Sequence, residues 1–147
     1  MRAGLIAILA MSLGAFLGCN KSPQMSPGPS PVGAEARLQQ IPPADAQKYG
    51  QMRDPKAWRN PYLLVKPDGL WLLDASNNEE RPLKPDQVLN ALAALPSSEW
   101  PFGRVVAVQE IVSENSDADR IAVRKNRAIL AGTLEGAKIL IDWVPSS

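Results

Sequence analysis

Apolar and polar residues in the second half of the chain are arranged as in two paired strands. The runs 62–66 and 70–74 are rich in Leu, Val, Tyr and Trp, and Pro67-Asp68-Gly69 separates them. An Asp-Gly turn between two such runs is a strong signal for a β-hairpin. We therefore predict a hairpin over residues 62–74, and Asn77-Asn78 interrupts the pattern after it.

The apolar spacing then changes to a helical period. Pro85 suits the first turn of a helix that Pro96 ends, and one face of this helix carries Val88, Ala91, Leu92 and Leu95. Ser116 and Asp119 have capping-box spacing and predict a second helix that runs to about Ala131. The residues expected on its inner face are Ala118, Ile121, Ala122, Ala128 and Ile129.

Two further apolar runs complete the predicted sheet. Residues 104–108 show no alternation, which is typical of an interior strand covered on both faces. Residues 138–144 predict a last strand before Pro145. The order ββαβαβ, with right-handed crossovers, predicts a small α/β (α+β) sandwich with two helices on one face of a sheet.

The chain before this domain has a different composition. Residues 20 to about 40 are rich in Pro and Ser and have few apolar side chains to bury, which favours open polyproline-II geometry. Residues 44–49 are compatible with a short helix that Gly50 ends. The predicted organisation is a signal peptide over 1–18, a Pro-rich flexible tether over 19–55 and a globular domain over 56–147.

Cys19 is the only cysteine, and it follows a short apolar segment. Arg2 precedes an apolar core over 5–16, which is the length of a secretion signal and too short to span a membrane. With the small Gly18 before Cys19, this region resembles the lipobox of bacterial lipoproteins, although Phe16-Leu17 replaces the commoner Leu-Ala or Leu-Ser. An uncleaved anchor and an ordinary secretory signal are the alternatives.

The lipoprotein resemblance implies lipidation of Cys19 and a membrane anchor. In that family the thiol receives a diacylglyceryl group, the signal is cut before the cysteine, and the new amino group is acylated. Asn20 stands where Asp would favour the inner membrane, so the resemblance implies the outer membrane on its periplasmic side. The outer face of the inner membrane and the cell surface are the alternatives.

The predicted domain carries a second resemblance. Its order of elements over 68–144, with a late helix, Gly136, an apolar strand and Pro145, resembles the periplasmic domains of the ExbD and TolR biopolymer-transport family. Those proteins begin with a transmembrane helix that bears an acidic residue, which this chain lacks. The resemblance therefore implies a domain that binds envelope partners or cell wall, and it does not imply proton coupling.

The residue types leave little material for catalysis. The chain has no histidine, and its one thiol is assigned to lipidation, so Ser-His-Asp, Cys-His and zinc sites are not expected. We predict no catalytic, cofactor-binding or metal-binding residue. The acidic pairs Glu79-Glu80 and Glu110 with Glu114 are interpreted as solvated surface, and the acids over 114–119 as helix capping rather than a calcium loop.

Two groups of residues are candidate binding surfaces. Basic and acidic residues are almost balanced, at 16 and 15, so nucleic acid is not an expected partner. Arg120, Arg124 and Arg127 share one helical stripe. This stripe is either a solvated face or a docking surface for an acidic partner, for phospholipid headgroups or for glycan phosphates. Trp58 and Trp100 lie near prolines in predicted loops, where they could form an exposed aromatic surface.

The hypothesis that fits these features best is a lipid-anchored envelope protein whose domain binds a protein partner without catalysis. One alternative is a lipoprotein that binds peptidoglycan or another glycan, which would use Trp58 or Trp100. A more distant alternative is a hydrolase that uses two carboxylates. The exposure of these aromatic, basic and acidic residues distinguishes the three hypotheses.

Overall fold

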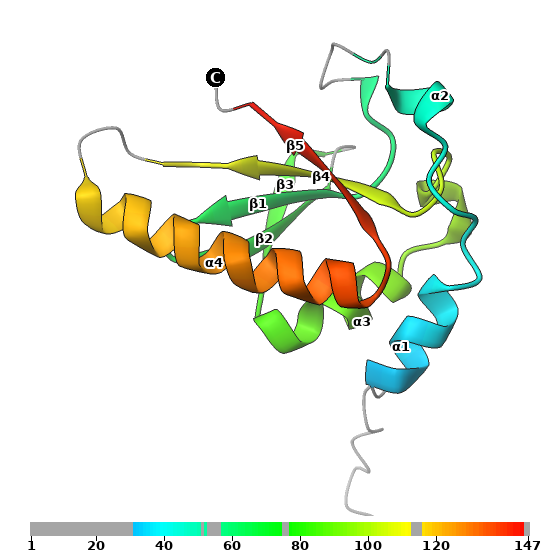
Figure 1. Cartoon of the computed structure of the whole chain (residues 1–147), viewed down its shortest axis with the longest axis horizontal. Helices are drawn as coiled ribbons and strands as arrows, with labels where there is room; N and C mark the ends of the chain where they lie inside the picture. Colours follow the sequence, from blue (N-terminus) through cyan, green and yellow to red (C-terminus); the bar gives the residue numbers. More distant parts are fainter. Residues whose placement is uncertain (1–30, 51, 53–56, 75–76, 113–115, 146–147) are drawn as a thin grey trace, which may run out of the picture.

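The computed structural model describes residues 31–50, 52, 57–74, 77–112 and 116–145, and the fold is a mixed sheet with helices packed on it (Figure 1). The described strands follow the order β3-β2-β1-β4-β5. Pairing is antiparallel from β1 to β3 through β2 and parallel from β1 to β5 through β4. The strands are β1 Tyr62–Lys66, β2 Gly69–Asp74, β3 Glu79–Leu83, β4 Val105–Glu110 and β5 Leu140–Val144. The predicted α/β class is confirmed.

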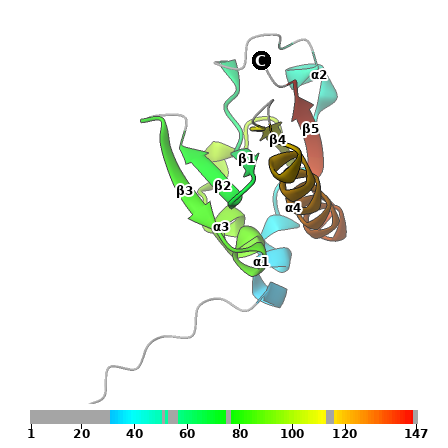
Figure 2. The same cartoon turned by 90° about the vertical axis from the view of Figure 1, so that its left-hand side faces the viewer.

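The main helices lie on one face of this sheet. Figures 1 and 2 show α4 running across it, with α3 and α1 together at one end. The described helices are α1 Pro31–Leu38, α2 Ala46–Tyr49, α3 Val88–Ala93 and α4 Asp117–Gly136, with short 3₁₀ turns η2 Pro85–Gln87 and η3 Ser97–Glu99. Buried residues of α3 and α4, such as Leu92 and Leu130, pack with Val106 of β4 in the main core. The prediction of two helices on one sheet face is therefore confirmed.

The interior position of β4 is also confirmed. Its residues Val105 to Val108 are all buried. Val106 and Val108 belong to the core under the helices, whereas Val105 and Ala107 belong to a second cluster on the opposite face. Both faces of this strand are covered, which explains its continuous apolar run.

The strand β3 was not predicted from the sequence pattern. Asn77-Asn78 forms a second hairpin turn, in which Asn78 has φ 58° and Asn77 Oδ1 accepts a hydrogen bond from the N–H of Glu79 at 3.0 Å. The strand reads Glu-Glu-Arg-Pro-Leu and is almost wholly exposed at the sheet edge. A polar edge strand has no apolar alternation to detect, and Pro is tolerated there. From β1 to β5 the observed order of strands and α-helices is βββαβαβ, and α1 and α2 precede it.

The long helix α4 begins as predicted but faces the sheet differently. Ser116 Oγ accepts a hydrogen bond from the N–H of Asp119 at 3.1 Å, and the helix continues past the predicted end to Gly136. The predicted inner face is wrong, since Ile121 is 66% exposed and Ala118, Ala128 and Ile129 are also exposed. The buried residues are Val123, Leu130 and Leu134.

Asn126 makes the buried stripe hard to recognise in the sequence. It stands between Val123 and Leu130 in the apolar spacing, yet it faces inward, and its Nδ2 donates a hydrogen bond to the carbonyl of Lys66 at 2.8 Å. The larger apolar residues Ile121 and Ile129 lie on the nearly opposite side of the helix, so the sequence pattern favoured that exposed face.

The predicted tether over 19–55 is wrong for residues 31–50, which belong to the packed structure. Ala34 and Leu38 of α1 are fully buried, and Leu38 is part of the main core. These two residues are one turn apart, which is too small an apolar pattern to predict a packed helix among prolines and polar residues. The predicted signal peptide, Cys19 and the Pro-rich segment up to Ser30 lie outside the described residues.

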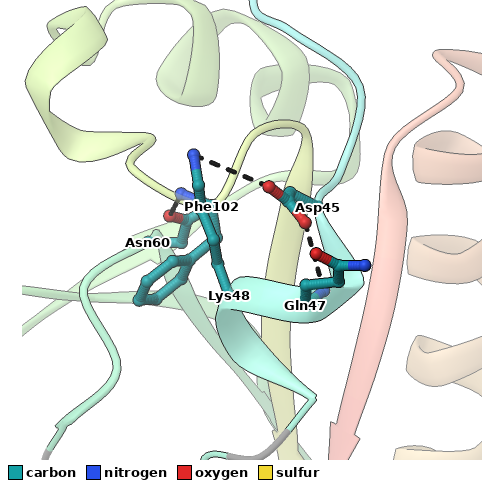
Figure 3. Close-up of polar contacts among 5 residues, drawn as sticks. All are labelled: Asp45, Gln47, Lys48, Asn60 and Phe102. Atoms are coloured by element: carbon teal, nitrogen blue, oxygen red, sulfur yellow. Dashed lines mark hydrogen bonds and ion pairs between the residues drawn. The ribbon is translucent and has the colours of Figure 1, made fainter.

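The segment after α1 crosses the end of the sheet to its other face. The N–H of Arg104 donates to the carbonyl of Pro42, and the N–H of Asp45 donates to the carbonyl of Phe102, both at 2.9 Å. Asp45 then caps α2 by accepting from the N–H of Gln47 at 3.1 Å (Figure 3). Tyr49 places its ring edge-on against Trp58, with centroids 5.9 Å apart. Residues 31–50 therefore contribute to the cores on both sheet faces.

Asn60 fixes the loop against which this segment packs. Its buried Nδ2 donates to the carbonyls of Gly103 at 2.7 Å and Val105 at 2.8 Å, and its Oδ1 accepts from the N–H of Phe102 at 2.9 Å (Figure 3). Gly103 has φ +78°, and a Cβ there would lie 2.2 Å from the carbonyl oxygen of Pro43. Only glycine allows this approach between the two backbone segments.

Candidate functional site

The predicted aromatic surface of Trp58 and Trp100 is wrong, because both side chains are buried, at 6% and 4% exposure. Trp58 donates from Nε1 to the carbonyl of Pro61 at 3.2 Å, and its ring packs on Phe102 with centroids 5.5 Å apart. Trp100 lies in the main core under the helices. The nearby prolines do mark chain connections. However, Ala44, Tyr49 and Met52 pack against Trp58, and α3 packs with Trp100 in the main core, so the two rings form no exposed aromatic surface.

The predicted arginine stripe is exposed on α4. Arg120, Arg124 and Arg127 are all exposed, and they lie on the flank of the helix that faces β5. Arg127 shows which flank this is, because its guanidinium carbon lies 4.1 Å from the ring centroid of Trp143 in β5. Arg127 Nη1 also pairs with Glu110 Oε1 at 2.6 Å, and Arg120 pairs with Asp117.

Sequence reasoning missed the partner of these arginines, which is the outer part of β5. Trp143 is 36% exposed and Leu140 is 55% exposed. The strand lies at the end of the sheet order and pairs on one side with β4. We call Arg120, Arg124, Arg127 and Trp143 the α4–β5 surface. Leu140 pairs in register with Val105, so its side chain lies on the other face of this edge strand. The signal for it was Pro145 directly after an apolar run, because proline is typical of an exposed strand end.

Successive residues of β5 direct their backbone N–H and C=O groups alternately toward β4 and away from it. The N–H of Leu140 donates to the carbonyl of Arg104 at 3.0 Å, so Leu140 points its hydrogen-bonding groups toward β4. In a parallel ladder successive residues alternate in this respect, and Ile141 and Trp143 therefore point their N–H and C=O groups away from β4. No strand in the described part of the chain pairs with that outer side. Pro145, at the next outward position, has no N–H.

Tyr62 and Asp142 lie on the sheet face opposite the main helices. Tyr62 donates from its hydroxyl to Gln109 Oε1 at 3.0 Å. Burial, and to a lesser extent the negative charge of Asp142, raise the pKa of the Tyr62 hydroxyl. The tyrosine thus stays a neutral hydrogen-bond donor at neutral pH, and it links β1 to β4 rather than serving as a base.

The acidic candidates do not form a facing pair. Glu79 and Glu80 are adjacent in β3, so they project to opposite faces of the sheet, and Glu80 pairs with Lys66. Glu110 pairs with Arg127, whereas Glu114 lies outside the described residues. Within the described ranges, no three His, Cys, Asp or Glu side chains are grouped as metal ligands would be.

A cleft of about 940 Å³ opens at the end of the sheet where β1 and β4 begin. It lies between the β2–β3 hairpin and residues 95–101, and Arg59, Arg81, Glu79 and Glu99 are among the side chains that line it. These four side chains are exposed and carry both signs of charge. Asn60 also lines the cleft and is buried, but its side-chain hydrogen bonds go to the backbone of Phe102, Gly103 and Val105, so it holds the loop rather than selecting a ligand.

Comparisons with known proteins give no relative for this chain. Neither a family model nor a curated protein nor a solved structure matches it. The candidate site is therefore chosen on geometry alone, and it is the α4–β5 surface, where Arg127 stacks on the exposed Trp143.

In the part of the chain that the structure describes, none of the helices has the length and apolar character needed to cross a membrane.

Proposed function

We propose that this chain is a lipid-anchored envelope protein whose domain binds a protein partner through the α4–β5 surface, without catalysis. The observation that carries the proposal is the stack of Arg127 on Trp143 at an exposed strand edge. Arg and Trp are the residue types that contribute most to protein interfaces. The ion pair with Glu110 restrains Arg127 from its other side, so the stacked side chains are partly ordered before a partner arrives.

The two alternative functions have less support. Glycan binding relied on exposure of Trp58 or Trp100, and both are buried. Hydrolysis by two carboxylates needs side chains that face each other across a substrate, and the pair Glu79-Glu80 projects to opposite sheet faces. Binding of a protein partner needs only the exposed surface that α4 and β5 provide.

Because residues 31–50 are packed on the domain, the linker to the proposed anchor is shorter than the predicted tether. Twelve peptide units separate Cys19 from Pro31, where α1 begins. Fully extended, they span at most about 40 Å. The proposed anchor would thus hold the domain within roughly its own diameter of the lipid surface, and the partner must be reachable there.

Lipidation itself is tested by Cys19→Ser. The serine hydroxyl is a far poorer nucleophile than a thiolate, so we expect the variant to incorporate no palmitate and to keep its signal peptide. Labelled palmitate and the mass of the purified protein measure the two outcomes. Equal labelling of the variant and the wild-type protein would contradict the proposed anchor.

The binding surface is tested by partner capture with two matched variants. Arg124→Glu and Lys125→Glu make the same charge change at exposed neighbours on α4, but Lys125 is not on the flank toward β5. With a photo-crosslinking residue in place of Ala131, which follows Arg124 and Arg127 on the same stripe of α4, we expect a crosslinked protein in intact cells. Arg124→Glu should reduce its yield at least fivefold, and Lys125→Glu should change it less than twofold. Absence of any crosslinked protein, or equal effects of both variants, would contradict the proposal.

A further inference from the structure

We propose that the partner docks as an extended acidic segment that adds a strand to the free edge of β5. This inference rests on the proposed function and specifies the partner's chemistry and binding mode. Ile141 and Trp143 present their N–H and C=O groups on the outer side of β5, where no described strand pairs with them. An incoming strand would pair with these groups in the way that known peptide ligands extend a sheet.

The opposite edge of the sheet is protected against such pairing, whereas β5 is not. The edge strand β3 contains Glu79, Glu80, Arg81 and Pro82, which are all exposed. Charged residues and proline are the usual protection of an edge strand. The edge of β5 instead exposes Leu140 and Trp143, and its proline comes only after the strand, at position 145. The fold therefore leaves one of its two edges open.

The charge beside this edge indicates an acidic segment. Ile141 and Trp143 pair in register with Val106 and Val108, which face the helices, so their side chains lie on the same sheet face as α4. A strand added beside β5 would direct every second side chain to that face, next to the arginine flank of α4. Arg124 makes no ion pair with any described residue, so an acidic side chain there would meet an available guanidinium.

The same charge disfavours a second copy of the chain as the occupant. Antiparallel pairing of two β5 strands would form one continuous sheet with both α4 helices on the same face. The two arginine flanks would then face each other across the new strand pair, and each carries Arg124, which makes no ion pair with a described residue. Like charges at such an interface oppose association. The positive charge of the arginine flank would attract an acidic strand from another protein, whereas it would repel the same flank of a second copy.

The test uses the mature lipidated protein in detergent and synthetic peptides. The acidic probe is a ten-residue peptide of alternating Val and Glu, blocked at both ends, and the basic control has Lys in place of Glu. We expect the acidic peptide to bind at least tenfold more tightly than the basic one in fluorescence anisotropy. Binding should weaken with added salt, because exposed charge pairs are screened. Hydrogen exchange should slow at the amides of Ile141 and Trp143.

Modified peptides test strand addition without altering the protein. Only alternate amides of an added strand face β5, so two acidic peptides are N-methylated at the odd or the even positions. One of them should lose at least tenfold in affinity, and the other should bind as the unmethylated peptide does. Ile141→Pro, which removes an outward N–H, should weaken binding to the same extent, and Ile141→Val should not.

The outcomes separate strand addition from the proposed function. No binding of the acidic peptide, equal binding of the basic peptide, equal effects of both methylation patterns, or unprotected Ile141 and Trp143 amides would overturn strand addition. A wild-type dimer that Ile141→Pro converts to a monomer would assign the edge to a second copy and overturn it as well. The proposed function would still stand if Arg124→Glu lowered partner crosslinking and Lys125→Glu did not.

Discussion

Replacing Asn60 with Asp is expected to lower the free energy of unfolding by about 3–5 kcal/mol, although the two side chains have almost the same shape. The buried Asn60 amide donates two hydrogen bonds, to the carbonyls of Gly103 and Val105. A carboxylate cannot donate either bond, and it would place negative charge against both carbonyl oxygens. Denaturation by urea of a chain that begins at Asn20 measures the difference.

The matched control for this change is Asn77→Asp. Asn77 is exposed in the β2–β3 turn, and its side-chain Oδ1 accepts a hydrogen bond from the N–H of Glu79. A carboxylate accepts this bond equally well, so we expect a change below about 0.5 kcal/mol. Equal effects at the two positions would show that the Asn60 bonds do not hold the 100–105 loop.

Much of the fold could be predicted because the responsible signals are local. The Asp-Gly turn, the Ser116 cap and the unbroken apolar run of β4 each depend on a few neighbouring residues. Elements that depend on distant partners could not be predicted in this way. The polar strand β3 pairs with β2 through its backbone, so its side chains carry no trace of the pairing.

In the candidate site, too, features that depend on neighbouring residues could be predicted and features that depend on distant residues could not. The helical spacing of Arg120, Arg124 and Arg127 depends only on their own helix, and it correctly placed them on one exposed stripe. Their proximity to Trp143 depends on how α4 turns back into β5 across a buried core. The burial of Trp58 depends on Ala44, Tyr49 and Met52, which belong to the segment expected to be tether. Prolines beside a tryptophan indicate a loop, but they do not indicate what covers it.

Replacing Leu38 with Asp is expected to destabilise the protein by about 4 kcal/mol, which tests whether residues 31–50 are structure or tether. Leu38 is fully buried in the main core, so the substitution removes its packing and places a charge in an apolar site. Val32→Asp is the matched control on the same helix, since Val32 is 79% exposed, and it should change stability by less than about 0.5 kcal/mol. Urea denaturation of the chain that begins at Asn20 measures both. If residues 31–50 were a flexible tether, neither substitution would lower the free energy of unfolding. If α1 is packed, only Leu38→Asp lowers it strongly, because α1 must separate from α3 before water can hydrate the carboxylate.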